Sequence, residues 1–82
     1  MFLSKIRITL RKSILDPQGK AVEHAIGTLG MEAIHDVRIG KYIEMSVDTK
    51  DEASARSTTD EICKKLLANP VMEDYHFDIE RA

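Results

Sequence analysis

The side chains best suited to metal binding or catalysis in this sequence are three histidines and one cysteine. They are His24, His35, His76 and Cys63. Structural metal sites place such ligands at short, regular spacings, for example HxxxH or CxxC. Neither spacing occurs here, so we interpret the histidines as surface or boundary residues and predict no metal site.

The sequence also lacks an activated nucleophile. Cys63 falls on the apolar stripe of a predicted helix, which favours a small buried hydrophobic residue over a reactive thiol. Asp48, Asp51 and Glu52 cluster at the predicted start of that helix, where negative charges interact favourably with the helix dipole. We therefore interpret these acids as structural rather than as a catalytic pair. No GxSxG, phosphate-binding or dinucleotide motif is present. We therefore predict no catalytic residues and no cofactor of its own, which leaves an interaction module.

The charge balance argues against a nucleic-acid surface. Twelve basic residues stand against fourteen acids, a net charge of −2, whereas nucleic-acid-binding domains show a basic patch. RNA binding on a sheet also needs exposed aromatic side chains on central strands. Tyr75 and Phe77 are expected in the core. Tyr42 is expected on the outer face, either as a contact for another protein or packed over a lysine stem.

Length and composition predict one small domain, residues 1–82. With 43% apolar and 32% charged residues the chain is typical of a globular protein. Domains of this size are often marginally stable alone, so self-association is expected. A single cysteine and the lack of a long apolar run favour a cytoplasmic protein.

Two strands and two helices are readily predicted. "KIRITLR" and "EDYHFDIE" alternate apolar and polar residues, as half-buried strands do. Asp16 and Pro17 begin a first helix that Gly30 ends, with an apolar stripe from Val22 to Leu29 facing the core. A second helix follows the capping-box pair Thr49 and Glu52 and runs to about Ala68, with its first half over small side chains or solvent.

The segment Ile34–Asp48 has strand character but contains Gly40. A tight hairpin at Gly40-Lys41 would shift the alternation by one residue and exchange core for solvent, which disfavours it. A three-residue loop keeps the phase, but glycine would stand at its start rather than its end. A continuous strand bent or bulged at Gly40 keeps Val37, Ile39 and Ile43 on one face, and we favour it without excluding the looser hairpin.

A continuous strand of this length would overreach its own domain. About fourteen residues span ~45 Å, whereas a compact chain of 82 residues has a diameter of roughly 30 Å. The overhang would expose unpaired backbone unless a second copy covers it. We therefore predict an α+β, ferredoxin-like sandwich: an antiparallel sheet with both helices on one face, extended across a homodimer or higher oligomer.

Three stretches raise a resemblance to a known family: "LDPQGKA", "VRIGKYIE" and "CKKLLANPVMEDYHFDIE". Together they resemble PurS, the small subunit of multi-subunit phosphoribosylformylglycinamidine synthase. The chain departs from the family pattern at Lys12-Ser13, where a proline-glycine step is common, and in the Ser- and Thr-rich middle of the second helix.

The resemblance implies a non-catalytic role in de novo purine biosynthesis. In that ligase complex a glutaminase subunit releases ammonia, and a large synthetase subunit, where ATP and Mg²⁺ are expected, uses it. The small subunit, as a homodimer, would bridge the two and assist ammonia transfer. No nucleic acid or membrane is expected as a partner.

The candidate interface residues lie in the polar stretches of those motifs that contain glycine or proline. These residues are Asp16, Pro17, Gln18, Gly19, Arg38, Gly40, Lys41, Tyr42, Asn69 and Pro70. Asp16-Pro17 and Asn69-Pro70 are explained equally well as the start and the end of helices. The alternative function is a dimeric ferredoxin-like ligand-sensing module, for which "KSILDPQG" would be the strand-to-helix loop.

Overall fold

Three antiparallel strands form a single sheet in the computed structural model, which describes residues 1–82. The strands are β1 (Phe2–Leu10), β2 (Gly40–Val47) and β3 (Glu73–Arg81), in the order β2-β1-β3. Ile6 of β1 pairs with Ile43 on one side and Phe77 on the other. The predicted first and last strands are confirmed, and β1 begins a few residues earlier than expected.

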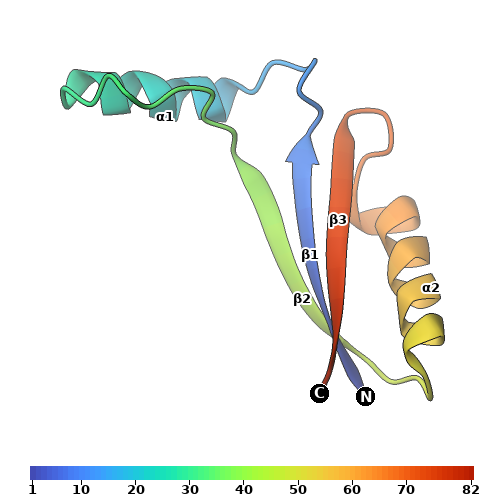
Figure 1. Ribbon diagram of the computed structural model, residues 1–82. Helices are drawn as coiled ribbons and strands as arrows, with labels where there is room; N and C mark the ends of the chain where they lie inside the picture. The colour runs from blue at the N-terminus through green and yellow to red at the C-terminus, as the bar shows by residue number, and fades with distance from the viewer.

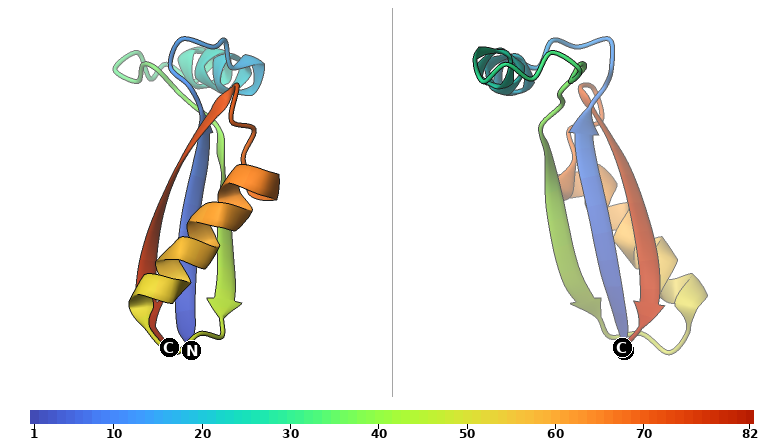
Figure 2. Two further views of the ribbon diagram at one scale, coloured as in Figure 1. Left: turned by 90° about the vertical axis from the view of Figure 1, so that its right-hand side faces the viewer. Right: turned by 60° about the vertical axis from the view of Figure 1, so that its left-hand side comes forward.

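One face of the sheet is covered by α2 (Glu52–Ile62), which continues into the short π-helical turn η1 (Cys63–Leu67) (Figures 1 and 2). The alternating residues of β1 point to this helix, and Ile6, Ile8 and Cys63 are fully buried there. The buried position predicted for Cys63 is confirmed. The other face of the sheet has no helix over it (Figure 2).

The first half of α2 lies over small side chains, as its composition predicts. Ala55 is fully buried, and the hydroxyls of Ser4 and Thr59 are hydrogen bonded at 2.7 Å. The helix begins two residues later than expected, because the Asp51 carboxylate accepts a hydrogen bond from the Ser54 N–H at 2.7 Å and Asp51, not Thr49, is the N-cap. The capping box predicted on Thr49 is therefore wrong.

Helix α1 (Pro17–Thr28) has the predicted boundaries but not the predicted position. Asp16 caps it, and Gly30 follows it with a φ of 85°, a conformation that suits glycine. Instead of packing on the sheet, α1 projects from its end, away from the side that α2 covers (Figures 1 and 2). The class and the antiparallel sheet are confirmed, whereas placing both helices on one face is wrong for α1.

The chain runs through Gly40 without turning back, which excludes the hairpin. The continuous strand is nevertheless wrong for residues 34–39, which run back along α1 before β2 begins (Figure 1). Asp36 has a φ of 57°, which no strand residue adopts. The N–H groups of Val37 and Ile39 donate to the side chains of Glu23 and Asp16 rather than to another strand.

The molecule is elongated, with extents of 51 × 27 × 14 Å. Its core is small, because only seven hydrophobic residues are buried. Neither α1 nor α2 has the length and hydropathy needed to span a lipid bilayer.

Candidate functional site

The three predicted interface stretches lie at one end of the sheet, where β1 ends and β2 and β3 begin (Figure 1). We call residues 11–19, 36–42 and 68–74 the loop end. Direct contacts join its parts. The Asp16 carboxylate accepts from the Ile39 N–H at 2.7 Å, Arg38 donates to the Arg11 carbonyl at 2.8 Å, and Arg11 donates to the Pro70 carbonyl at 2.7 Å.

Asp16 is a structural residue of the loop end, with only 3% of its surface exposed. One carboxylate oxygen accepts from the Gly19 N–H at 2.9 Å and the other from the Ile39 N–H. Hydrogen bonds from the backbone N–H groups of Gly19 and Ile39 lower the pKa of Asp16 below its usual value. The carboxylate therefore ties the start of α1 to the start of β2.

Gly19 is buried because the backbone of the returning chain passes close to it. A side-chain carbon at this position would overlap the Val37 carbonyl oxygen and approach the Asp16 carboxylate to within 2.8 Å. Pro17 and Gln18 on the same turn are exposed. Within the stretch from Asp16 to Gly19, these two residues are the accessible ones.

Arg38 is half-buried and fastens the connection between β1 and α1. Its guanidinium donates to the carbonyls of Arg11 and Ile14, each at 2.8 Å. The planar guanidinium carries five donors in a fixed geometry and suits such multiple carbonyl contacts. In the single chain, Arg38 is thus committed to its own backbone.

Gly40, Lys41 and Tyr42 open β2 and are exposed. The Tyr42 side chain lies on the uncovered face, is 58% exposed, and donates from its hydroxyl to Glu44 at 3.0 Å. Lys41 approaches Glu73 at 3.6 Å across the end of β1, in an ion pair whose lysine is exposed and whose glutamate side chain is 16% exposed. These side chains remain accessible to another protein.

Asn69 and Pro70 form the exposed turn that leads into β3. The Asn69 side-chain oxygen accepts from the Val71 N–H at 3.0 Å, and the Asn69 backbone N–H donates to the Glu73 carboxylate at 2.8 Å. The Pro70 carbonyl is held by Arg11. This turn is stabilised by its own polar groups and by the end of β1.

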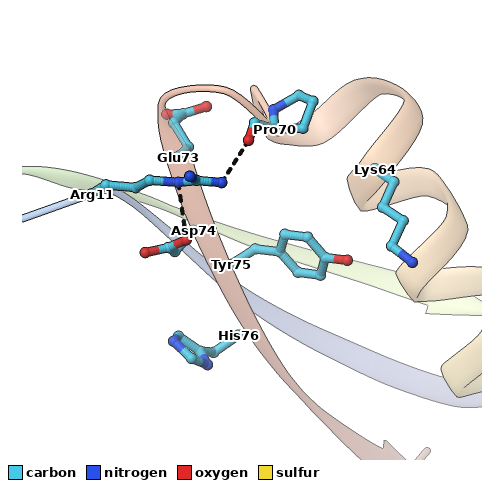
Figure 3. Close-up of a pocket in the computed structure, with 7 residues that line it drawn as sticks. All are labelled: Arg11, Lys64, Pro70, Glu73, Asp74, Tyr75 and His76. Atoms are coloured by element: carbon cyan, nitrogen blue, oxygen red, sulfur yellow. Dashed lines mark hydrogen bonds and ion pairs between the residues drawn. The ribbon is translucent and has the colours of Figure 1, made fainter. Parts of the chain in front are cut away.

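A hollow of about 550 Å³ lies beside this turn (Figure 3). Its charged groups are already paired in part, since Arg11 Nε lies 3.4 Å from Asp74. Lys64 approaches from η1 and His76 from the uncovered face of β3. The lining residues are Arg11, Lys64, Pro70, Glu73, Asp74, Tyr75 and His76.

Several of these residues escape sequence reasoning. Arg11 ends an alternating strand and reads as an ordinary outward-facing residue. Its role depends on the register in which Leu10 pairs with Glu73, which places Arg11 against the turn before β3. Glu73 gains its contact with Lys41 for the same reason. Both contacts depend on the pairing of strands that are far apart in the sequence, so no local sequence pattern predicts them.

The uncovered face of the sheet is a row of ion pairs. Lys5 lies 2.9 Å from Glu80 and Arg7 lies 3.3 Å from Asp78, each pair joining β1 to β3. The face is therefore polar and internally neutralised. His76 is exposed on this face, and His24 and His35 are exposed on α1 and the segment after it, so the three histidines do not converge.

The titratable groups with shifted pKa values belong to structural contacts. The Tyr75 hydroxyl donates to Asp60 at 2.6 Å, which raises the pKa of Tyr75 to about 12 and lowers the pKa of Asp60. Burial raises the pKa of the Cys63 thiol, and the negative charge of Asp60 adds to the effect. A thiol stabilised in its neutral form is a poor nucleophile. These groups hold α2 against β3.

Taken together, the loop end can present a shaped, polar surface. Its N–H and carbonyl groups are held by side chains of the chain itself, while Gln18, Lys41, Tyr42 and Pro70 remain exposed. Fixed polar groups around accessible side chains are features of protein interfaces that bind with little rearrangement.

Comparisons with known proteins place the whole chain in a family. The family "PurS: Phosphoribosylformylglycinamidine (FGAM) synthase" matches residues 3–81. Three relatives are informative. A Synechocystis protein named phosphoribosylformylglycinamidine synthase subunit PurS is 48% identical over 92% of this chain and 75% of its own length.

The Bacillus subtilis protein of the same name is 42% identical over 98% of this chain and 94% of its own length. Its solved structure has a TM-score of 0.88 and covers 99% of this chain and 100% of that one. The Methanocaldococcus jannaschii PurS structure, described as one of the subunits of formylglycinamide ribonucleotide amidotransferase in the purine biosynthetic pathway, is 33% identical with a TM-score of 0.88. It covers 100% of this chain and 99% of that one.

Proposed function

The chain belongs to the PurS family, and from this we propose that it is the small subunit of phosphoribosylformylglycinamidine synthase in de novo purine biosynthesis. The observation that carries the proposal is the match of residues 3–81 to the family, together with relatives up to 48% identical that bear this name. The elongated three-stranded fold agrees with solved structures of that family at a TM-score of 0.88.

In this proposal the subunit does no bond chemistry. A glutaminase subunit releases ammonia from glutamine, and a large synthetase subunit, which binds ATP and Mg²⁺, uses the ammonia to amidate formylglycinamide ribonucleotide. The small subunit joins the two and helps to seal the route between them. Water along that route would protonate ammonia to ammonium, which has no lone pair and cannot attack, so a closed path is needed.

The loop end supplies the contact surface for the partner subunits. Lys41, Tyr42 and Gln18 are exposed there, on a frame fixed by Asp16 and Arg38. The frame residues act by holding the exposed ones in place. Of the predicted interface residues, the exposed ones are therefore expected to contact the partner subunits, and Asp16 and Arg38 are expected to position them.

The working form is a homodimer in the cytoplasm. Support for self-association comes from the small core and from the exposed apolar residues, because a chain that buries so little is expected to complete itself with another copy. The relatives are subunits of a metabolic ligase, which supports the cytoplasmic location.

Co-purification with the glutaminase and synthetase subunits of the same organism tests the proposal. Lys41→Glu combined with Tyr42→Ala should reduce retention of the partner subunits at least about tenfold, because accessible aromatic residues dominate many interfaces. Lys50→Glu, an exposed lysine at the opposite end of the sheet, is the matched control and should retain both partners.

Two outcomes would contradict the proposal at different levels. If the wild-type chain retains neither partner subunit, the assignment to the synthase complex fails. If the double variant retains both as well as Lys50→Glu does, the assignment stands and the start of β2 is not the docking site. Charge reversal at Arg38 is avoided, since it would break contacts within the chain.

The ligand-sensing alternative is not favoured. The family match and the named relatives all belong to PurS. The turn from Asp16 to Gly19, which would serve as a ligand loop, is closed by the returning chain at Val37 and Ile39.

A further inference from the structure

The hollow beside the turn before β3 is open to solvent and adjoins the loop end (Figure 3). Four of its seven lining residues belong to the loop end, and the other three are Lys64, Tyr75 and His76. The loop end is the proposed contact surface for the partner subunits. The hollow is therefore accessible to a side chain that a docked partner presents.

The Lys64 ammonium is held at the edge of this hollow. Its Nζ lies 2.9 Å from one Asp60 oxygen, and the other Asp60 oxygen accepts from the Tyr75 hydroxyl at 2.6 Å. Tyr75 packs against the core under α2, so the acid that orients Lys64 is itself fixed. A side chain held in this way loses less conformational freedom on binding than a free lysine does.

Arg11 is fixed at another side of the hollow. Its Nη2 donates to the Pro70 carbonyl at 2.7 Å, and its Nε lies 3.4 Å from Asp74. In Figure 3 the Tyr75 side chain lies between Arg11 and Lys64. Both positive groups are thus positioned by contacts within the chain.

The hydrogen-bonding groups left over on these two cations are all donors. A guanidinium has five N–H groups, of which Arg11 uses two, and an ammonium has three, of which Lys64 uses one. The remaining N–H groups need acceptors from outside the chain. An ionised oxygen makes the strongest hydrogen bonds to such donors.

The acids of the hollow restrict which anion fits. Both oxygens of Glu73 are engaged, by the Asn69 N–H at 2.8 Å and by Lys41 at 3.6 Å, and Asp74 lies beside the guanidinium. These two negative charges balance the two positive ones, so there is no net positive field to hold a multiply charged phosphate. A single carboxylate needs only the spare N–H groups and is the better match.

A carboxylate on a docked polypeptide suits the hollow better than a free one. Sites for small molecules are lined mostly by apolar side chains, whereas five of the seven residues here are charged or titratable. The side chain of a partner subunit needs few contacts in the hollow itself, because other residues of the loop end, such as Lys41 and Tyr42, hold that subunit in place.

We propose that the hollow binds a carboxylate side chain of a partner subunit docked on the loop end, through N–H groups of Lys64 and Arg11, with Asp60 as the positioning residue for Lys64. This rests on the proposed function and deepens it, because it states which chemistry the partner must carry opposite η1 and the turn before β3.

The affinity of the chain for the purified glutaminase and synthetase subunits tests the site. Lys64→Gln should weaken binding about tenfold, because it removes a charge-assisted hydrogen bond. Lys65→Gln is the matched control and should bind as the wild type does. The two lysines are 65% and 69% exposed and each pairs with an acid four residues earlier, but Lys65 does not line the hollow. Circular dichroism confirms that each variant is folded.

The salt dependence of the same binding gives a second readout. Raising the ionic strength should weaken binding of the wild type, because salt screens the contact between Lys64 and the carboxylate. Lys64→Gln should show a smaller salt dependence, and Lys65→Gln should show that of the wild type. The same salt dependence in all three proteins would overturn the proposal.

Titration of the wild-type chain with glutamate and with inorganic phosphate tests for a free ligand. Amide chemical shifts of residues 73–76 report on the hollow, and neither compound should saturate them at millimolar concentration. Saturable binding of either one that Lys64→Gln abolishes, with no change in affinity for the partner subunits, would overturn the proposal in favour of a small-molecule site.

The failure of this site and the failure of the proposed function are distinguishable. If both lysine variants bind the partner subunits as the wild type does, the hollow is not used and the assignment to the synthase complex stands. Equal losses in the two variants would show a general effect of charge and would also overturn the site. A wild-type chain that binds neither subunit would contradict the proposed function itself.

Discussion

At the scale of single residues, polar side chains of this protein hold backbone in place. Asp16 and Asp51 cap the two helices, and each carboxylate has its pKa lowered by N–H groups that it accepts from. Arg38 closes the connection from β1 to α1 through backbone carbonyls. These residue types also occur in active sites, but here their partners are the chain's own N–H and carbonyl groups.

Tyr75 offers a test of this structural use of polar groups. Its pKa is raised from 10.0 to about 12 by the hydrogen bond to Asp60. A raised pKa in the folded state contributes stability below pH 10 that is lost as pH climbs from 10 to 12. Thermal unfolding of Tyr75→Phe should therefore change less across that window than unfolding of the wild type.

Ultraviolet titration of Tyr42→Phe isolates Tyr75, since the chain has two tyrosines. The single remaining transition should centre near pH 12 in the folded protein. A midpoint near 10, the ordinary value, would contradict the contact with Asp60.

At the scale of elements, α2 and α1 follow the same local rules and have different surroundings. Both begin at an aspartate cap. Helix α2 lies on the sheet and buries Ala55, Thr59 and the adjoining Cys63, whereas α1 buries only Gly19. Val22 and Leu29 in the apolar stripe of α1 are therefore exposed, and strand β2 begins only where the chain after residues 34–39 reaches the sheet.

Gly27 in α1 and Gly40 in β2 differ in how much space a side chain would have. A side-chain carbon at Gly27, inside α1, meets nothing within 4 Å, so Gly27→Ala should stabilise the fold by about 0.5–1 kcal/mol. A side-chain carbon at Gly40 would lie 2.6 Å from the Ile8 carbonyl oxygen, and Gly40→Ala should cost about 1–3 kcal/mol.

Chemical denaturation in dilute protein measures both glycine variants, each against the wild type. A Gly40→Ala variant as stable as the wild type would contradict the close approach of β2 to β1 at Gly40, because the added carbon would then have room.

At the scale of the whole molecule, shape and exposure point to association. The chain is 51 Å long and 14 Å thick, and its seven buried hydrophobic residues make a small core for 82 residues. Small domains of this kind need additional buried surface from some source. The proposed second copy would supply it without a disulfide or a metal, and would leave the loop end available for other subunits.

Stability should therefore depend on protein concentration. Unfolding of a dimer releases two chains, so a tenfold rise in concentration should raise the Tm by about 4 °C for a pair of this size. Differential scanning calorimetry over a hundredfold range of concentration measures the effect. A constant Tm would mean that the folded unit is the single chain.

Local patterns in the sequence alone determined the first and last strands in chain order, the start and end of α1, the buried position of Cys63 and the small side chains under α2. Each rests on neighbours within a few residues: alternation, an aspartate cap, a glycine stop. The family resemblance carried by the motif stretches, which the comparisons confirm, also needed no structure.

Only the tertiary structure decided where α1 lies and what residues 34–39 do. Apolar alternation there is compatible with a strand, but the N–H groups of Val37 and Ile39 are taken by Glu23 and Asp16 from α1 and its cap. The gathering of Arg11, Arg38 and Pro70 at one end likewise follows from strand register. Apolar periodicity in the sequence shows which side chains favour burial. Hydrogen bonds between distant segments decide whether another part of the chain covers those side chains or leaves them exposed.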